Sequence, residues 1–154
     1  MIHNKGLKKP DESQLDFRID KNREFYILEV APMGAVRMTK RDKIFTNPNH
    51  KDPQKKQREV VTRYFKFQND IWNEYNLKPF TFPSNLDVIF CMPMPKSWSE
   101  KKRAKMNRKP CNSRPDIDNL VKALMDAIKM EDADVWKITA EKRYSYKGSI
   151  IIFT

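Results

Sequence analysis

A stretch without proline or glycine, residues 54–76, constrains the fold more than any other feature. The sequence has 10 prolines and 3 glycines among 154 residues, so most segments are interrupted sooner. Large apolar side chains recur within this stretch at intervals of mostly three and four, which is the period of an amphipathic helix. They are Val61, Tyr64, Phe65, Ile71, Trp72 and Tyr75. We therefore predict a helix over residues 54–76 with one apolar face.

Short β-rich segments lie before and after this helix. Residues 24–30 and 86–92 each predict a strand that ends near a proline. A second amphipathic helix is expected over residues 120–130, and the last two strands, 138–145 and 149–153, are expected to form a hairpin. The order of these elements indicates an α+β fold: a single domain with a mixed or antiparallel sheet and two main helices on one face.

The remaining segments define the domain boundaries. Residues 1–23 are polar and lack apolar periodicity, so we expect a flexible N-terminal arm ahead of one folded domain at residues 24–154. Residues 40–53 contain two prolines and predict a connecting loop. Apolar runs fall far short of the roughly 20 residues that span a bilayer, and the N-terminus has no signal-peptide core. We expect a cytoplasmic protein without membrane contact.

Charge is the strongest compositional signal. The chain has 31 Lys and Arg against 20 Asp and Glu, a net charge of +11, which favours a polyanionic partner and above all nucleic acid. Three glycines are too few for a glycine-rich phosphate-binding loop. Between residues 96 and 114 the only acid is Glu100, and we predict a basic, DNA-binding loop there. The candidate DNA-binding residues are Lys96, Lys101, Lys102, Arg103, Lys105, Arg108, Lys109 and Arg114.

The next segment is acidic and begins with two closely spaced aspartates. Asp116 and Asp118 would point about 200° apart in a continuous helix, but to the same side in an extended segment that leads into a helix. Pro115 favours the extended placement. Carboxylates without His or Cys suit Mg²⁺, with Mn²⁺ as a substitute. Capping of the helix N-terminus explains the same two acids equally well.

Two more residues complete the candidate site. A third carboxylate would strengthen a metal site, and we choose Asp132 because the final strands can bring it beside Asp116. Lys122 lies four residues after Asp118, where a cation can neutralise charge that develops on a phosphate. A salt bridge on the helix surface is the alternative role of Lys122.

Residues 114–128, which read RPDIDNLVKALMDAI, resemble the signature R-P-D-x-D-N-L-x-K-x-x-x-D-A-[LI] of the RusA-like Holliday junction resolvases. This family consists of phage and prophage endodeoxyribonucleases. Residues 131–135, EDADV, resemble the family's D-D-[SA]-Q-V element, with departures at Glu131 and Asp134. The resemblance implies a RusA-like fold in which Asp116, Asp118 and Asp132 bind the catalytic metal ion and Lys122 is an essential cation.

The resemblance also implies a Mg²⁺-dependent homodimer that resolves four-way DNA junctions by paired symmetric nicks. Such an enzyme would serve DNA recombination and repair, in a bacterial cytoplasm if a phage encodes it. Apolar residues 150–153 are a candidate subunit surface, although they can equally fill the core of one subunit. Two other functions fit these residues: a flap or replication-fork nuclease, and a non-catalytic DNA-binding module.

Overall fold

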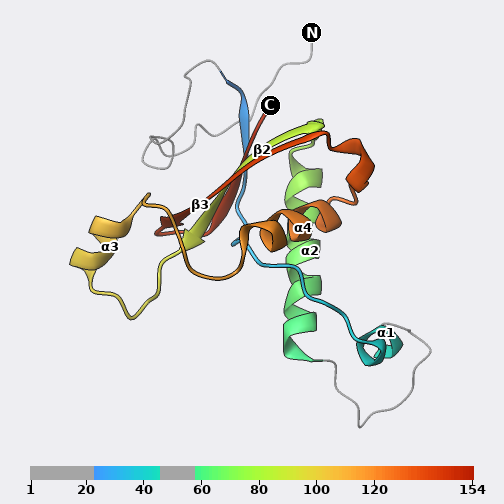
Figure 1. Cartoon of the computed structure of the whole chain (residues 1–154), viewed down its shortest axis with the longest axis horizontal. Coiled ribbons are helices and arrows are strands. Elements are labelled where there is room, and N and C mark those ends of the chain that lie inside the picture. Colours follow the sequence, from blue (N-terminus) through green and yellow to red (C-terminus); the bar gives the residue numbers. More distant parts are fainter. Residues whose placement is uncertain (1–22, 46–57) are drawn as a thin grey trace.

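The computed structural model describes residues 23–45 and 58–154, with Ile44, Phe45 and Asp132 described through their backbone alone (Figure 1). Four strands form one mixed sheet in the order β1-β4-β2-β3, in which β4 is antiparallel to β1 and β2, and β3 is parallel to β2. The strands are β1 (Phe25–Leu28), β2 (Asn85–Pro93), β3 (Lys137–Ser145) and β4 (Ser149–Phe153). The helices are α1 (Lys40–Phe45), α2 (Glu59–Leu77), α3 (Glu100–Met106) and α4 (Ile117–Ala127), and a short 3₁₀ turn, η2 (Asp132–Asp134), follows α4.

The predicted α+β fold with a mixed sheet and two main helices is confirmed. The predicted N-terminal arm lies, apart from Arg23, outside the described residues. None of the helices in the described ranges is long and apolar enough to cross a membrane.

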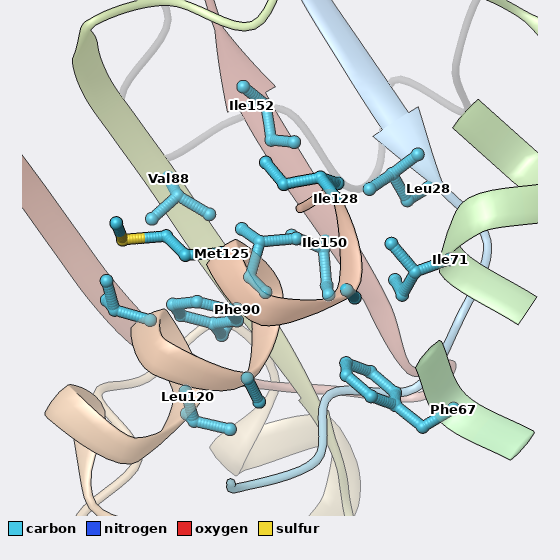
Figure 2. Close-up of a cluster of buried hydrophobic side chains, with 14 of the residues drawn as sticks. Leu28, Phe67, Ile71, Val88, Phe90, Leu120, Met125, Ile128, Ile150 and Ile152 are labelled. Atoms are coloured by element: carbon cyan, nitrogen blue, oxygen red, sulfur yellow. The ribbon is translucent and has the colours of Figure 1, made fainter. Parts of the chain in front are cut away.

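The two main helices, α2 and α4, pack on the same face of the sheet. Figure 2 shows Phe67 and Ile71 of α2 and Leu120 of α4 together with the strand residues Phe90 and Ile150. All five side chains are buried, and they belong to one continuous apolar cluster. This cluster fixes the position of α4, and therefore of the acidic residues at its N-terminus, relative to the sheet.

Strand β4 is buried on both of its faces. Ile150 and Ile152 join the core under the helices, whereas Ile151 and Phe153 form a second cluster on the opposite face of the sheet. Successive strand side chains point to opposite faces, so an all-apolar strand must be covered on both sides. The suggestion that residues 150–153 provide a subunit surface is wrong, because these side chains are at most 3% exposed within one chain.

The predicted hairpin of the last two strands is wrong. Strands β3 and β4 do not pair with each other, because β2 lies between them and pairs with both. The connection 146–148 passes around the end of β2 at Pro93, and Gly148 fits there because a Cβ would lie 2.6 Å from the Cβ of Ala31. Two β-rich segments with a short glycine-containing link carry the hairpin signal. To pass from β3 over β2 to β4, the chain must span two strand spacings, about 10 Å in all, and a three-residue link is long enough for that.

Both predicted loops contain a short helix. Helix α1 occupies the first part of the predicted loop 40–53, and the rest of that loop lies outside the described residues. Helix α3 occupies the middle of the basic stretch 96–114, where the Ser99 side chain accepts a hydrogen bond from the Lys102 N–H at 3.3 Å and caps the helix. These helices have only 6 and 7 residues, too few for an apolar periodicity to appear in the sequence.

The two long helices begin at different residues from those predicted. Helix α2 begins at Glu59. Residues 54–57, which belong to the predicted helix, lie outside the described part of the chain. Helix α4 begins at Ile117 and ends at Ala127, three residues earlier at each end than the predicted 120–130. This earlier start brings Asp118 into the first turn of the helix.

Candidate active site

Asp116 and Asp118 stand at the N-terminus of α4, as predicted. Asp116 is the N-cap residue in extended backbone (φ −68°, ψ 150°), and Asp118 lies in the first turn. Both side chains are exposed, and Asp116 makes no side-chain capping hydrogen bond. Helix capping therefore does not account for the Asp116 carboxylate, which remains available to a ligand.

The two aspartates line one open cavity of about 580 Å³ at the edge of the sheet. Strand β3 contributes Glu141, so three carboxylates share this cavity. The described residues that line it are Pro110, Cys111, Asn112, Asp116, Ile117, Asp118, Glu141, Lys142 and Arg143. The cavity combines acids suited to a cation with bases suited to a phosphate.

The sequence did not indicate Glu141 as a site residue. Its carboxylate accepts a hydrogen bond from the Arg143 Nε at 2.8 Å, and Arg143 also donates to the carbonyl of Arg108 at 3.1 Å. Both side chains are about three-quarters buried, at 28% and 24% exposure. Glu141 is thus held in a fixed position at the cavity by a residue on its own strand.

Lys142, which points to the opposite face of β3 from Glu141, connects β3 to the segment before α4. Its ammonium donates to the carbonyls of Ser113 at 2.7 Å and Pro115 at 2.8 Å, which ties β3 to the segment that enters α4. Gly34 packs under the same segment, and a Cβ there would lie 2.8 Å from the Cβ of Pro115. These contacts restrain the backbone immediately before Asp116.

One wall of the cavity is a segment that runs along the outer edge of β3. The Cys111 N–H donates to the carbonyl of Lys142 at 3.0 Å, and the Arg108 N–H donates to the carbonyl of Tyr144 at 2.8 Å. Pro110 forms an isolated antiparallel bridge with Arg143. The carboxyl-terminal part of β3 is therefore covered, and the cavity lies where this cover ends.

Lys122, also a predicted site residue, is not among the described residues that line this cavity. Lys122 is exposed on α4, one turn after Asp118. Asp132 begins η2, beyond the end of α4 that is farther from Asp116 (Figure 1). The Asp132 side chain is outside the described part of the structure, so its place in the site stays a prediction.

The donor set of the cavity fits Mg²⁺. Magnesium is commonly held by one or two carboxylates together with waters and substrate phosphate, and Asp116 and Asp118 meet that requirement with oxygen donors alone. Among the described side chains, no three Asp, Glu, His or Cys groups converge closely enough to hold a metal ion by themselves. A bound ion would therefore depend on water, phosphate or a further carboxylate for its remaining ligands.

Four of the eight predicted DNA-binding residues lie on α3, which stands away from the sheet, and the other four precede or follow it in the sequence (Figure 1). Six of the eight are exposed, whereas Arg103 and Arg108 are half-buried. The Arg103 guanidinium lies 5.4 Å from the Tyr146 ring centre, and the Lys102 ammonium lies 4.1 Å from that of Trp98. Trp98 packs in turn on the ring of Tyr144, so aromatic contacts join this basic helix to β3.

Asp126, within the RusA-like signature, has a structural partner. The Tyr64 hydroxyl on α2 donates a hydrogen bond to its carboxylate at 3.1 Å. Burial and the neighbouring Asp126 charge both raise the pKa of Tyr64, because each disfavours the tyrosinate anion. Asp126 therefore helps to hold α4 against α2.

The family model described as Endodeoxyribonuclease RusA matches residues 37–153 of this chain. The matched range includes every described residue of the cavity lining, as well as α3 and α4. A search of curated proteins finds no match.

Proposed function

This chain belongs to the RusA endodeoxyribonuclease family, and we propose that it is a Mg²⁺-dependent enzyme that resolves four-way DNA junctions by paired nicks. The observation that carries the proposal is the shared cavity of Asp116 and Asp118 beside a basic helix. Hydrolysis of a DNA phosphodiester needs a cation at the reacting phosphate and a surface that attracts the rest of the backbone. The carboxylates of the cavity and the basic residues of α3 would supply these two requirements.

Asp116 and Asp118 would hold the metal ion, and the family resemblance adds Asp132 as a third ligand. When bound there, Mg²⁺, or Mn²⁺ in its place, would lower the pKa of a water molecule and so supply a nucleophile. Pro115 and Lys142 keep the carboxylates in position, because the Lys142 ammonium donates to the Pro115 carbonyl. Lys122 would balance negative charge on the phosphate from the next turn of α4.

The basic residues of and around α3 would track the DNA backbone. They carry no sequence information, since lysine and arginine contacts to phosphate position a protein without reading bases. Selection of a branched substrate would come from geometry instead. Resolution needs two nicks related by two-fold symmetry, and each chain has one such cavity among its described residues, so we propose a homodimer as the active form.

A cleavage assay on three substrates tests the proposal. A four-way junction, a flap and a plain duplex of matched sequence are each incubated with Mg²⁺, and again with excess EDTA. We expect paired symmetric nicks in the junction that EDTA abolishes, and slow or no cleavage of the duplex. Preferential cleavage of the flap would replace the junction resolvase with a flap nuclease. Tight binding without cleavage of any substrate would identify a DNA-binding module.

A further inference from the structure

Strand β3 forms one edge of the sheet, and only part of this edge is covered by described residues. The segment 108–111 pairs with Lys142, Arg143 and Tyr144. No described strand or loop pairs with the outer side of residues 137–141. An uncovered strand edge offers backbone N–H and C=O groups to another strand.

The direction of these backbone groups follows from the ladder. The Ser145 carbonyl faces inward, where it accepts from the Met94 N–H at 3.0 Å, whereas the Tyr144 and Lys142 groups face outward to the covering segment. Backbone groups alternate along a strand, and β3 pairs with β2 in one unbroken register. Ile138 and Ala140 therefore direct their N–H and C=O groups to the open edge.

The open edge is complementary to itself. In an antiparallel pairing with a two-fold axis at Thr139, Ile138 lies opposite Ala140 of the second copy, and both have outward backbone groups. Lys137 then lies opposite Glu141, in the type of pair whose side chains approach most closely. An axis at Ala140 would instead place Ile138 opposite Lys142, whose carbonyl already accepts from Cys111. An axis at Ile138 would place Lys137 opposite Thr139, so Lys137 and Glu141 would not pair.

Exposed apolar side chains lie beside the same edge. Trp136 is 75% exposed and Ile138 is 49% exposed, although both are large hydrophobic residues. A lysine on a strand edge ordinarily discourages pairing with other chains. Here Lys137 lies four residues from Glu141, so the same lysine favours a partner with this sequence over other strands.

We propose that two copies of this chain join through antiparallel pairing of their β3 edges, centred on Thr139, and form one continuous sheet. Glu141 lines the candidate active site, so the partner subunit's Lys137 lies at the rim of each cavity. Arg143 already fixes Glu141, which presents its carboxylate in a defined position. This inference rests on the proposed two-fold assembly and names the surface that forms it.

Charge exchange across the axis tests this arrangement by sedimentation velocity at micromolar concentration. Lys137→Glu places two acids opposite each other at both ends of the pairing, and Glu141→Lys places two lysines there. We expect each variant alone to be mainly monomeric, with a dissociation constant raised at least about tenfold, and an equimolar mixture to recover the dimer. Lys105→Glu, on exposed α3, makes the same charge change as Lys137→Glu and is expected to leave the dimer intact.

A cross-link provides a second test that does not depend on charge. Residues 139 of the two copies face each other across the axis at a Cα separation of about 4.5 Å, which suits a disulfide. Thr139→Cys is expected to give a covalent dimer on oxidation, whereas Lys137→Cys, which faces residue 141, is not. Cys91 and Cys111 are buried and do not compete.

The outcomes separate the interface from the enzyme. A wild-type dimer that survives both charge variants, or forms no Thr139→Cys cross-link, overturns the β3 interface and leaves junction cleavage to be judged by its own assay. Single variants that are monomeric but do not recover a dimer on mixing also overturn it. A wild-type protein that is monomeric even on a junction overturns both the interface and the paired-nick mechanism.

Discussion

Arg58, at the start of α2, donates a hydrogen bond from Nε to the buried carboxylate of Asp42 in α1 at 3.0 Å. Asp42 is 1% exposed, and it also accepts from the N–H and hydroxyl of Thr39 at 2.7 and 2.8 Å. The Arg58 hydrogen bond, followed by that of the Thr39 N–H, holds the pKa of Asp42 well below its ordinary value of 3.8. One buried carboxylate therefore joins the two helices.

This pair predicts a specific loss of stability in acid. Because the folded-state pKa of Asp42 is lowered, its contribution is present above about pH 3.8 and is lost as the pH falls below that value. Urea unfolding between pH 2.5 and 7 is expected to show a smaller acid-dependent loss for Asp42→Asn than for wild type. The control is Asp70→Asn, which removes an exposed ion pair with Lys66. Equal pH profiles for wild type and Asp42→Asn would contradict this assignment.

Tyr64→Phe is expected to lower the free energy of unfolding by about 1 to 2 kcal/mol at pH 7, because it removes the hydrogen bond to Asp126. The pKa of Tyr64 is raised above its ordinary value of 10.0, so the tyrosine's contribution is present below pH 10 and is lost as the pH rises further. Denaturant unfolding at pH 7 and pH 11 is expected to show a smaller difference between the two proteins at the higher pH. Tyr75→Phe, also on α2, serves as the control.

Asp116→Asn and Asp118→Asn are each expected to reduce junction cleavage at least about 100-fold, because each removes a negative ligand for the metal ion. Junction binding is expected to be retained or strengthened, since less negative charge then faces the phosphates. Single-turnover cleavage and a gel-shift titration on the same preparations measure the two effects. Near wild-type cleavage by either variant would move the metal site away from the N-terminus of α4.

Replacement of Lys101, Lys102 and Lys105 by glutamine is expected to flatten the salt dependence of junction binding. Each lost phosphate contact changes the slope of log affinity against log salt by about 0.9. Fluorescence anisotropy between 50 and 300 mM NaCl measures the slope, and the exposed Lys78→Gln, which removes one positive charge outside α3, serves as the control. A triple variant with the wild-type slope would show that α3 does not contact the DNA backbone.

Gly148→Ala is expected to destabilise the fold by about 1 to 3 kcal/mol through overpacking. The new Cβ would lie 2.6 Å from the Cβ and 2.7 Å from the Cα of Ala31, and backbone at that distance cannot move aside cheaply. Thermal unfolding of Gly148→Ala and of the exposed neighbour variant Lys147→Ala measures the difference. Similar melting temperatures for both would show that the connection between β3 and β4 tolerates a side chain.

Local signals in the sequence were sufficient for several elements. Helix α2 was predicted because apolar spacing reports which side of a helix is buried, whatever it packs against. Strand β2 was predicted because a β-rich segment ends at a proline. The arrangement of Asp116 and Asp118 was predicted for the same reason: Pro115 and the start of the apolar stripe act on adjacent residues. The RusA-like signature is also contiguous, and the family match confirms the relationship that it indicated.

Tertiary structure alone decided how distant segments meet. The position of β2 between β3 and β4, which replaced the predicted hairpin, depends on strand pairing across the whole chain. Glu141 joins Asp116 and Asp118 only because β3 forms the sheet edge beside the N-terminus of α4. Neighbouring residues determine whether a segment becomes a strand, but burial of the complete core determines which strand lies beside it, and no local pattern records that choice.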